Sequence, residues 1–192
     1  MQGKLILLVG VPGAGKSTLM QYARDAFPKI VFPKSWTTRP MRPGETEGVT
    51  YHFATDEEFA EAAKEGKFLE WVTIDSGRCY GTLKEDITSA LAVGKYVLRE
   101  VEPIGARNIR TLLPGQVVTI FITAGSWEEM SRRIQARAPI DAEELERRRE
   151  RYEQELSFGA EADFTISNRD GELERAKEAL TQTIRQITNS KL

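Results

Sequence analysis

The sequence has one cysteine and one histidine, Cys79 and His52, among 192 residues. A single cysteine excludes a disulfide within the chain and suits a reducing compartment. Metal sites need several ligands, and none cluster around His52, so we expect a structural role for it. A catalytic thiol needs a base partner, so we expect Cys79 to be an ordinary buried or half-buried thiol. No apolar run approaches the roughly 20 residues that cross a bilayer. We therefore expect a cytoplasmic protein.

An excess of charge of one sign is also missing. Lysine and arginine number 27, aspartate and glutamate 29, and the net charge is −2. This balance gives no reason to expect a nucleic-acid or membrane partner. The length suits a single domain over residues 1–192 with a small insertion. We expect small-molecule partners and either a monomer or a homo-oligomer.

Short apolar runs alternate with amphipathic segments along most of the chain. The runs predict strands, the longest of them at 4–9, 95–101 and 116–123. Periodic segments predict helices at 16–25, 82–94, 103–113, 126–137, 141–156 and 171–187. Thr55 and Glu58 fit a capping box, which predicts a further helix from Asp56. This order predicts an α/β fold with a parallel sheet. The stretch 33–92 differs, because short strands and loops dominate it, and it predicts an inserted small lobe.

The segment GVPGAGKS, residues 10–17, lies between an apolar run and a helical pattern. It fits the phosphate-binding loop G-x-x-x-x-G-K-[ST], whose backbone N–H groups hold phosphates at a helix N-terminus. Lys16 is expected to reach the β and γ phosphates, and Ser17 to ligate Mg²⁺. The alternative is a glycine turn without a ligand. The pattern predicts ATP or GTP binding by Gly10, Pro12, Gly13, Ala14, Gly15, Lys16, Ser17 and Thr18.

Several later motifs, in the expected order, resemble the guanylate kinase family. They are Ser35, TTRPMRPGE at 37–45, Tyr51, FLEW at 68–71 and YGT at 80–82. The resemblance runs from the first strand to Asn168. It implies transfer of the γ-phosphate of ATP to GMP, with dGMP also accepted and Mg²⁺ as cofactor.

The resemblance also implies a particular fold and division of the chain. The fold is the three-layer P-loop kinase fold, with a parallel core sheet, a small mixed α/β GMP-binding lobe and a helical lid. The core is expected at 1–32, 93–125 and 157–192, the lobe at 33–92 and the lid at 126–156.

Two arginines three residues apart, Arg39 and Arg42, lie in a loop stiffened by proline and glycine. Guanidinium groups bind a phosphate monoester bidentately, and the phenols of Tyr51 and Tyr80 can donate to the same phosphate. Glu45 resembles a residue that holds this loop in place. The alternative for these residues is an ordinary solvated surface.

A guanine base presents two donors, N1–H and the 2-amino group, beside one acceptor, O6. By the resemblance, Glu70 accepts from the two donors, while the hydroxyls of Thr82 and Ser35 serve the base. Adenine would leave Glu70 unpaired, and such sites reject the wrong partner strongly. The alternative is an exposed strand carboxylate whose neighbours, Leu69 and Trp71, point inward.

Arginines also mark the segment expected to form the lid. Arg133 and Arg137 share a helix face, and an apolar stripe at Leu145, Tyr152 and Leu156 inclines Arg148 toward the protein. The resemblance implies that these three arginines stabilise the transferring phosphoryl group together with Lys16. A solvated charged hairpin is the alternative. Asn168 resembles a family position near the adenine.

The stretch LREVEP departs from the family pattern, which usually has two aspartates two residues apart. Glu100 and Glu102 stand in their places, and Arg99 interrupts the apolar run. By position, Glu102 belongs to the GMP site and Glu100 could hold Mg²⁺ through a water. Two other functions stay open: a small-molecule kinase acting on a ribose bisphosphate, and a binding module of this fold with impaired catalysis.

Overall fold

The computed structural model describes residues 3–42, 44–49, 51–73, 77–137 and 140–189, except for the side chain of Arg137. A four-stranded sheet at its centre has the order β6-β1-β7-β8. Every neighbouring pair in this sheet is parallel. Its strands are β1 (Leu5–Gly10), β6 (Val97–Glu100), β7 (Val117–Thr123) and β8 (Phe164–Ser167).

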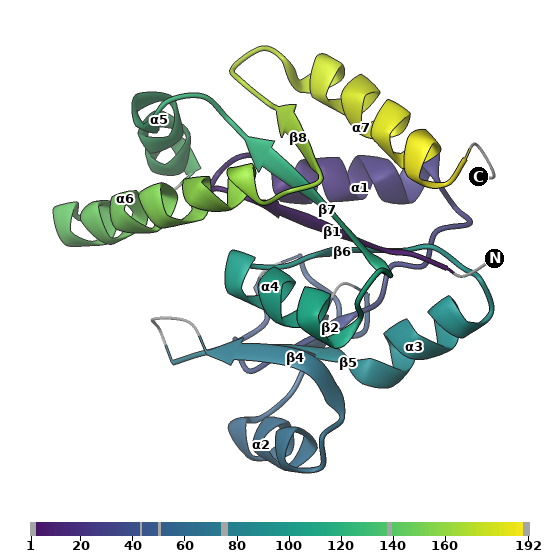
Figure 1. Cartoon of the computed structure of the whole chain (residues 1–192). Helices are drawn as coiled ribbons and strands as arrows, with labels where there is room; N and C mark the ends of the chain where they lie inside the picture. Colours follow the sequence, from purple (N-terminus) through teal and green to yellow (C-terminus); the bar gives the residue numbers. More distant parts are fainter. Residues whose placement is uncertain (1–2, 43, 50, 74–76, 138–139, 190–192) are drawn as a thin grey trace.

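Strand β1 lies between two neighbours, and all six of its residues are buried. Such complete burial is what a continuous apolar run favours in a parallel sheet covered on both faces. Figure 1 shows α1 and α7 on one side of the sheet, and α3 and α4 on the other. These helices are α1 (Lys16–Ala26), α3 (Lys84–Ala92), α4 (Pro103–Leu112) and α7 (Leu173–Ile187). The predicted α/β architecture is confirmed.

A second sheet forms the small lobe, with the order β3-β2-β5-β4. Strands β2 and β3 are parallel, whereas β5 is antiparallel to both β2 and β4. The strands are β2 (Ser35–Thr37), β3 (Tyr51–Phe53), β4 (Phe68–Thr73) and β5 (Cys79–Leu83), and helix α2 (Asp56–Lys64) covers them. The predicted capping box of α2 is present, with Thr55 and Glu58 bonding each other's backbone N–H.

The boundary between β5 and α3 differs from the sequence-based expectation. A helix over 82–94 was expected, but Thr82 and Leu83 end strand β5 and α3 begins at Lys84. Thr82 pairs with Ser35 of β2 and with Glu70 of β4, and this pairing extends the strand. Helix α3 buries Ile87 and Leu91 in the main core, so it connects the lobe to the core.

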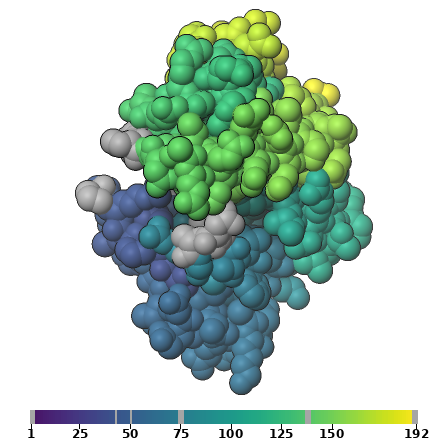
Figure 2. Space-filling view, turned by 90° about the vertical axis from the view of Figure 1, so that its left-hand side faces the viewer, coloured from purple at the N-terminus to yellow at the C-terminus, as the bar shows by residue number. Residues whose placement is uncertain are grey.

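Two helices project beside the sheet: α5 (Trp127–Arg137) and α6 (Ala142–Leu156), the latter followed by a short 3-10 turn, Ser157–Ala160. Figure 2 looks onto this side and shows the green helices above the blue small lobe. The expected apolar stripe of α6 is partly wrong. Tyr152 is buried, but Leu156 is 42% exposed. The neighbouring Glu155 is the residue that α6 buries at this end. Among the described residues, no helix is long and apolar enough to cross a bilayer.

Candidate active site

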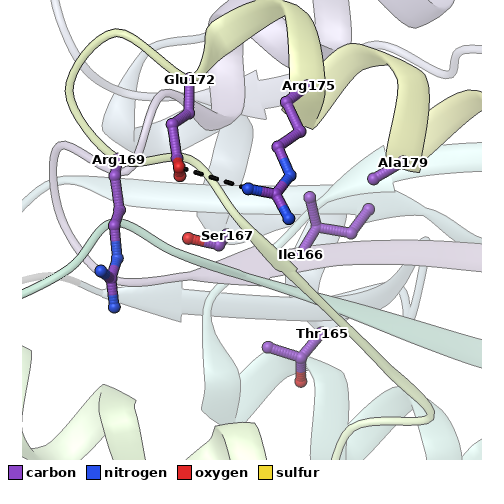
Figure 3. A pocket seen from close by; sticks show the side chains of 7 residues that line it. All are labelled: Thr165, Ile166, Ser167, Arg169, Glu172, Arg175 and Ala179. Atoms are coloured by element: carbon purple, nitrogen blue, oxygen red, sulfur yellow. Dashed lines mark ion pairs between the residues drawn. The ribbon is translucent and has the colours of Figure 1, made fainter.

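Two hollows in the described part of the chain have polar linings. The larger, a cleft of about 590 Å³, lies between the core and the small lobe, and Arg151 of α6 also lines it. The smaller, of about 380 Å³, lies between β8 and α7 and is shown in Figure 3. Its charged residues are solvent-accessible, and Arg175 pairs with Glu172 at 3.5 Å. The larger cleft gathers most of the chemistry-bearing side chains.

The phosphate-binding loop follows β1 and leads directly into α1. Gly13 and Gly15 have φ angles of 77° and 82°, in the left-handed region that glycine adopts readily. A Cβ on Gly13 would also lie 2.6 Å from the Cε of Met130, which packs over the loop from α5. Both glycines are therefore required by the shape of the loop itself.

Asn168 supports this loop from the end of β8. Its side-chain Nδ2 donates to the carbonyl of Ala14 at 2.7 Å, and the residue is only 6% exposed. A Cβ on Gly15 would lie 2.5 Å from the same Nδ2. The structure thus places Asn168 as a brace behind the loop, whereas the resemblance led us to expect it near the adenine.

Lys16 folds back onto the loop, where its Nζ donates to the carbonyls of Gly10 at 2.5 Å and Val11 at 3.2 Å. Ser17 is exposed at the start of α1 and lines the cleft together with Glu100. Burial raises the pKa of Glu100, while the charge of Lys16 and the hydroxyl of Ser17 act in the opposite direction.

The donor set at this point fits Mg²⁺. No group of three metal-ligating side chains exists among the described residues. Mg²⁺ in kinases needs only one or two protein ligands, because water and phosphate oxygens complete its shell. A half-buried carboxylate beside a hydroxyl, as in Glu100 and Ser17, supplies oxygens of the kind that this cation prefers.

The arginine loop is preassembled at the other end of the cleft. Both terminal nitrogens of Arg39 donate to Glu45 at 2.8 Å, forming a bidentate pair. The guanidinium lies 5.3 Å from the ring of Tyr51 and 5.4 Å from that of Phe53. Glu45 also accepts from the backbone N–H of Arg42 at 2.7 Å. These bonds lower the pKa of Glu45 to about 2, so the carboxylate stays ionised and organises the loop.

Ser35, Thr82 and Glu70 form one row across three adjacent strands of the small-lobe sheet. Glu70 is only 9% exposed, and its Oε1 accepts from the hydroxyl of Thr82 at 2.8 Å. The exposed-carboxylate alternative is therefore wrong. A register shift between Phe68 and Glu70 changes the alternation, so Trp71, at 48% exposure, faces outward instead.

The structure brings most of the expected acceptor-site residues to the cleft. Thr82 is the exception, because it is completely buried behind Glu70 and does not line the cleft. The expected residues that do line it are Ser35, Arg39, Arg42, Glu45, Tyr51, Glu70, Tyr80, Glu100 and Glu102, together with Ser17.

The arginines of α5 and α6 are bound to partners within the protein. Arg133 donates through Nε to Asp170 at 2.6 Å and through Nη1 to the carbonyl of Asn168 at 2.9 Å. Arg148 pairs with Glu144 of its own helix at 2.7 Å. The side chain of Arg137 lies outside the described residues.

Arg24, Arg99 and Arg151 also line the cleft and were not predicted as site residues from the sequence. Arg99 is 5% exposed on β6, and its Nη2 lies 3.6 Å from Oε1 of Glu70. Arg151 reaches from α6 to Glu102 and Glu155, at 3.3 Å each. Burial and the charge of Glu102 raise the pKa of Glu155 to about 7. The interruption of an apolar run by Arg99 was the one signal that could have identified it.

A phosphate-binding loop at the carboxyl end of a parallel sheet, a small lobe across the cleft and a helical hairpin beside it define the class of P-loop nucleotide kinases. Comparison with known proteins gives the family. The model of the guanylate kinase family matches residues 2–187, and the chain belongs to that family.

Individual relatives agree with this assignment. The chain is 40% identical over 186 residues to the guanylate kinase of Rubrobacter xylanophilus, which covers 97% of this chain and 95% of the relative. It is 40% identical over 172 residues to the guanylate kinase of a Nostoc species, covering 90% and 85% respectively. A crystal structure of guanylate kinase from Anaplasma phagocytophilum has the same fold, with a TM-score of 0.75 at 24% identity over 96% of this chain and 86% of that one.

Proposed function

We propose that the protein transfers the γ-phosphate of ATP to GMP, and also to dGMP, giving ADP and GDP or dGDP. The observation that carries this proposal is the buried Glu70 at one end of a cleft whose other lining includes a preassembled arginine loop. A carboxylate and a pair of guanidinium groups match the two ends of a guanine nucleotide. Membership of the guanylate kinase family supports the same activity.

The acceptor phosphate is bound by the arginine loop. Arg39 and Arg42 supply positive charge, and Tyr51 and Tyr80 supply phenolic donors. Burial raises the pKa of Tyr51, so its hydroxyl stays protonated and able to donate. Glu45 positions Arg39 through its bidentate pair. The phosphate oxygen of GMP is already anionic at neutral pH, so the attack needs no general base.

The base is read at the inner end of the cleft. Glu70 accepts from N1–H and the 2-amino group of guanine, and Ser35 lies two strands away in the same row. Thr82 acts through Glu70, whose Oε1 it holds. Glu102 lines the cleft on the core side and pairs with Arg151, and both observations support a role for it in the same site.

The donor nucleotide is bound by the phosphate-binding loop, where Lys16 leaves its two carbonyl partners and contacts the β and γ phosphates. Ser17 would hold Mg²⁺ directly and Glu100 through a water, and the ion would offset phosphate charge. Arg133, Arg137 and Arg148 surround the transferring group and stabilise its charge, and for this Arg133 and Arg148 exchange their present partners for phosphate. Positioning and charge stabilisation of this kind account for most of the catalysis of phosphoryl transfer.

The division of the chain is part of the proposal. Residues 33–92 form the GMP-binding lobe, with α3 as its connection to the core, and residues 126–156 form the lid. Lid closure would exclude water from the reacting groups and limit the rate. We propose a cytoplasmic enzyme with nucleotides as its only substrates.

The test is an ADP-release assay with ATP, Mg²⁺ and one acceptor at a time: GMP, dGMP, AMP, UMP or ribose 1,5-bisphosphate. We expect turnover with the two guanine nucleotides alone. Glu70→Gln should reduce kcat/KM for GMP by about 100-fold, because one charged acceptor is lost in a buried site. Glu57→Gln, on the exposed face of α2, is the matched control. Turnover of ribose 1,5-bisphosphate would refute the proposal. Absence of ADP release with every acceptor tested would refute it as well.

A further inference from the structure

Arg99 occupies a position where a charge is costly. It lies on β6 opposite Leu7 of β1, beside Leu98, which is completely buried. Only 5% of Arg99 is exposed. An apolar residue of similar size would fit this strand without the desolvation cost of a buried cation. A guanidinium retained here therefore needs a physical explanation.

The partners of Arg99 within the protein do not satisfy it. Its Nη2 lies 3.6 Å from Oε1 of Glu70, which is an ion pair but too long for a hydrogen bond. Its Nε and Nη1 are buried and have no hydrogen-bond partner among the described residues. Buried donors in folded proteins are nearly always paired. Nη2 is not among these fully buried, unpaired nitrogens, so it is the atom through which Arg99 can meet a ligand in the cleft.

The location of Arg99 indicates which ligand atom could supply the missing hydrogen-bond acceptor. Arg99 and Glu70 line the same cleft. Glu70 only accepts hydrogen bonds when ionised, so it cannot serve the oxygen at position 6 of a guanine base. The hydroxyl of Thr82 cannot serve it either, since it is fully buried and already donates to Glu70. Ser35 also lines the cleft, but its one hydroxyl donates a single hydrogen bond, whereas a carbonyl oxygen has two lone pairs to fill.

We propose that Arg99 is a specificity-determining residue that donates a hydrogen bond to O6 of guanine, while Glu70 accepts from N1–H and the 2-amino group. This inference rests on the proposed function of the cleft as the GMP site. A charged donor beside a charged acceptor matches the acceptor–donor–donor edge of guanine. Adenine presents an amino group at position 6 and an acceptor at N1, so it would oppose both side chains at once.

The experiment measures GMP, 6-thioguanosine monophosphate and IMP binding to the full-length protein by calorimetry. The thio compound keeps N1–H and the 2-amino group but weakens the acceptor at position 6, whereas IMP lacks only the 2-amino group. We expect the wild type to prefer GMP to the thio compound by about tenfold, as for a hydrogen bond to a charged donor. Arg99→Met should reduce this preference to about twofold and leave the preference for GMP over IMP unchanged.

Arg99→Lys is the second variant, and it keeps the charge and a donor should Arg99→Met fail to fold. We expect it to preserve part of the preference for GMP over the thio compound. An undiminished preference in both variants would overturn the inference, as would parallel loss of the thio and IMP preferences, since Arg99 would then act only through Glu70. Wild-type protein that does not bind GMP would instead overturn the proposed function.

Discussion

The two ends of the cleft hold their cations in different ways. On the acceptor side, Arg39 is 4% exposed and already has the orientation that its bidentate pair with Glu45 imposes. On the donor side, Lys16 bonds loop carbonyls, and Arg133 bonds Asp170 and a backbone carbonyl. Under the proposed function, GMP enters a prepared site, whereas ATP must draw its cations away from partners within the protein.

The pKa values of two carboxylates, Glu45 in the arginine loop and Glu155 in α6, are shifted in opposite directions. Hydrogen bonds from Arg39 lower the pKa of Glu45 to about 2, so its ionised form stabilises the folded state at neutral pH. Burial raises the pKa of Glu155 to about 7, so the ionised form of this carboxyl is disfavoured in the folded protein. The arginine loop is therefore a stabilised arrangement, whereas helix α6 holds an unfavourable charge. Four experiments test this contrast.

The largest effect is expected from Lys16→Met. It should lower kcat by about 10²–10³-fold, because a charge that stabilises the transferring phosphoryl group is lost. Calorimetric affinity for GMP should stay within about twofold of wild type, since the acceptor side needs no help from Lys16. Lys29→Met, exposed and beyond the end of α1, is the control. A comparable loss of GMP affinity would contradict the independence of the two sides.

Arg39→Lys should raise KM for GMP by about 30–100-fold, because an ammonium group cannot reproduce the bidentate geometry. The KM for ATP should not change. Steady-state kinetics with each substrate varied in turn measure both values. Arg175→Lys on the exposed face of α7 serves as the control. If KM for ATP rose equally, the preassembled loop would not be specific to the acceptor.

Glu155→Gln should change how stability depends on pH. In the wild type, the unfolded carboxyl ionises near pH 4.5 and the folded one only near 7, so stability falls between these values and then levels off. The variant should lose this fall, and its stability relative to wild type should be about 3 kcal/mol higher at pH 8 than at pH 4.5. Urea unfolding across that range measures it, with Glu153→Gln, an exposed neighbour, as control. An equal slope in both variants would contradict the buried-charge interpretation.

The smallest effect is expected from Asp170→Asn, which removes the charge that holds Arg133. Since Arg133 must leave this partner to bind ATP, its release should lower KM for ATP by about threefold. Kinetics with ATP varied at saturating GMP provide the measurement, and Glu174→Gln on α7 is the control. A rise in KM would mean instead that Asp170 supports Arg133 in its working position.

Local signals in the sequence were sufficient for much of this description. The glycine-rich loop, the capping box at Thr55 and the strand near 116–123 depend on neighbouring residues, and the structure has all three. Burial of Glu70 depends instead on a register shift in β4, which no alternation pattern could show. The start of α3 was also misplaced, because pairing of Thr82 with distant strands outweighs a helical pattern.

Arg151, which lines the cleft, and its partner Glu155 were missed for one physical reason. Arg151 and Glu155 lie in a highly charged helix, where nothing local distinguishes the side chains that turn inward from those that face solvent. Their contact with Glu102 joins residues about 50 positions apart. The resemblance to a family pointed to Arg148 in this helix, and the position of Arg151 became evident only from the packing.

The bond between Asn168 and Ala14 has a consequence for the newly synthesised chain. It spans 154 positions, from the end of the last strand to the first turn. The complete nucleotide-binding signature leaves the ribosome early, but its brace is made near the end of translation. A nascent or prematurely terminated chain thus carries the recognisable motif without the support that shapes it, and nucleotide affinity should emerge late, after the sheet has gained its outer strand.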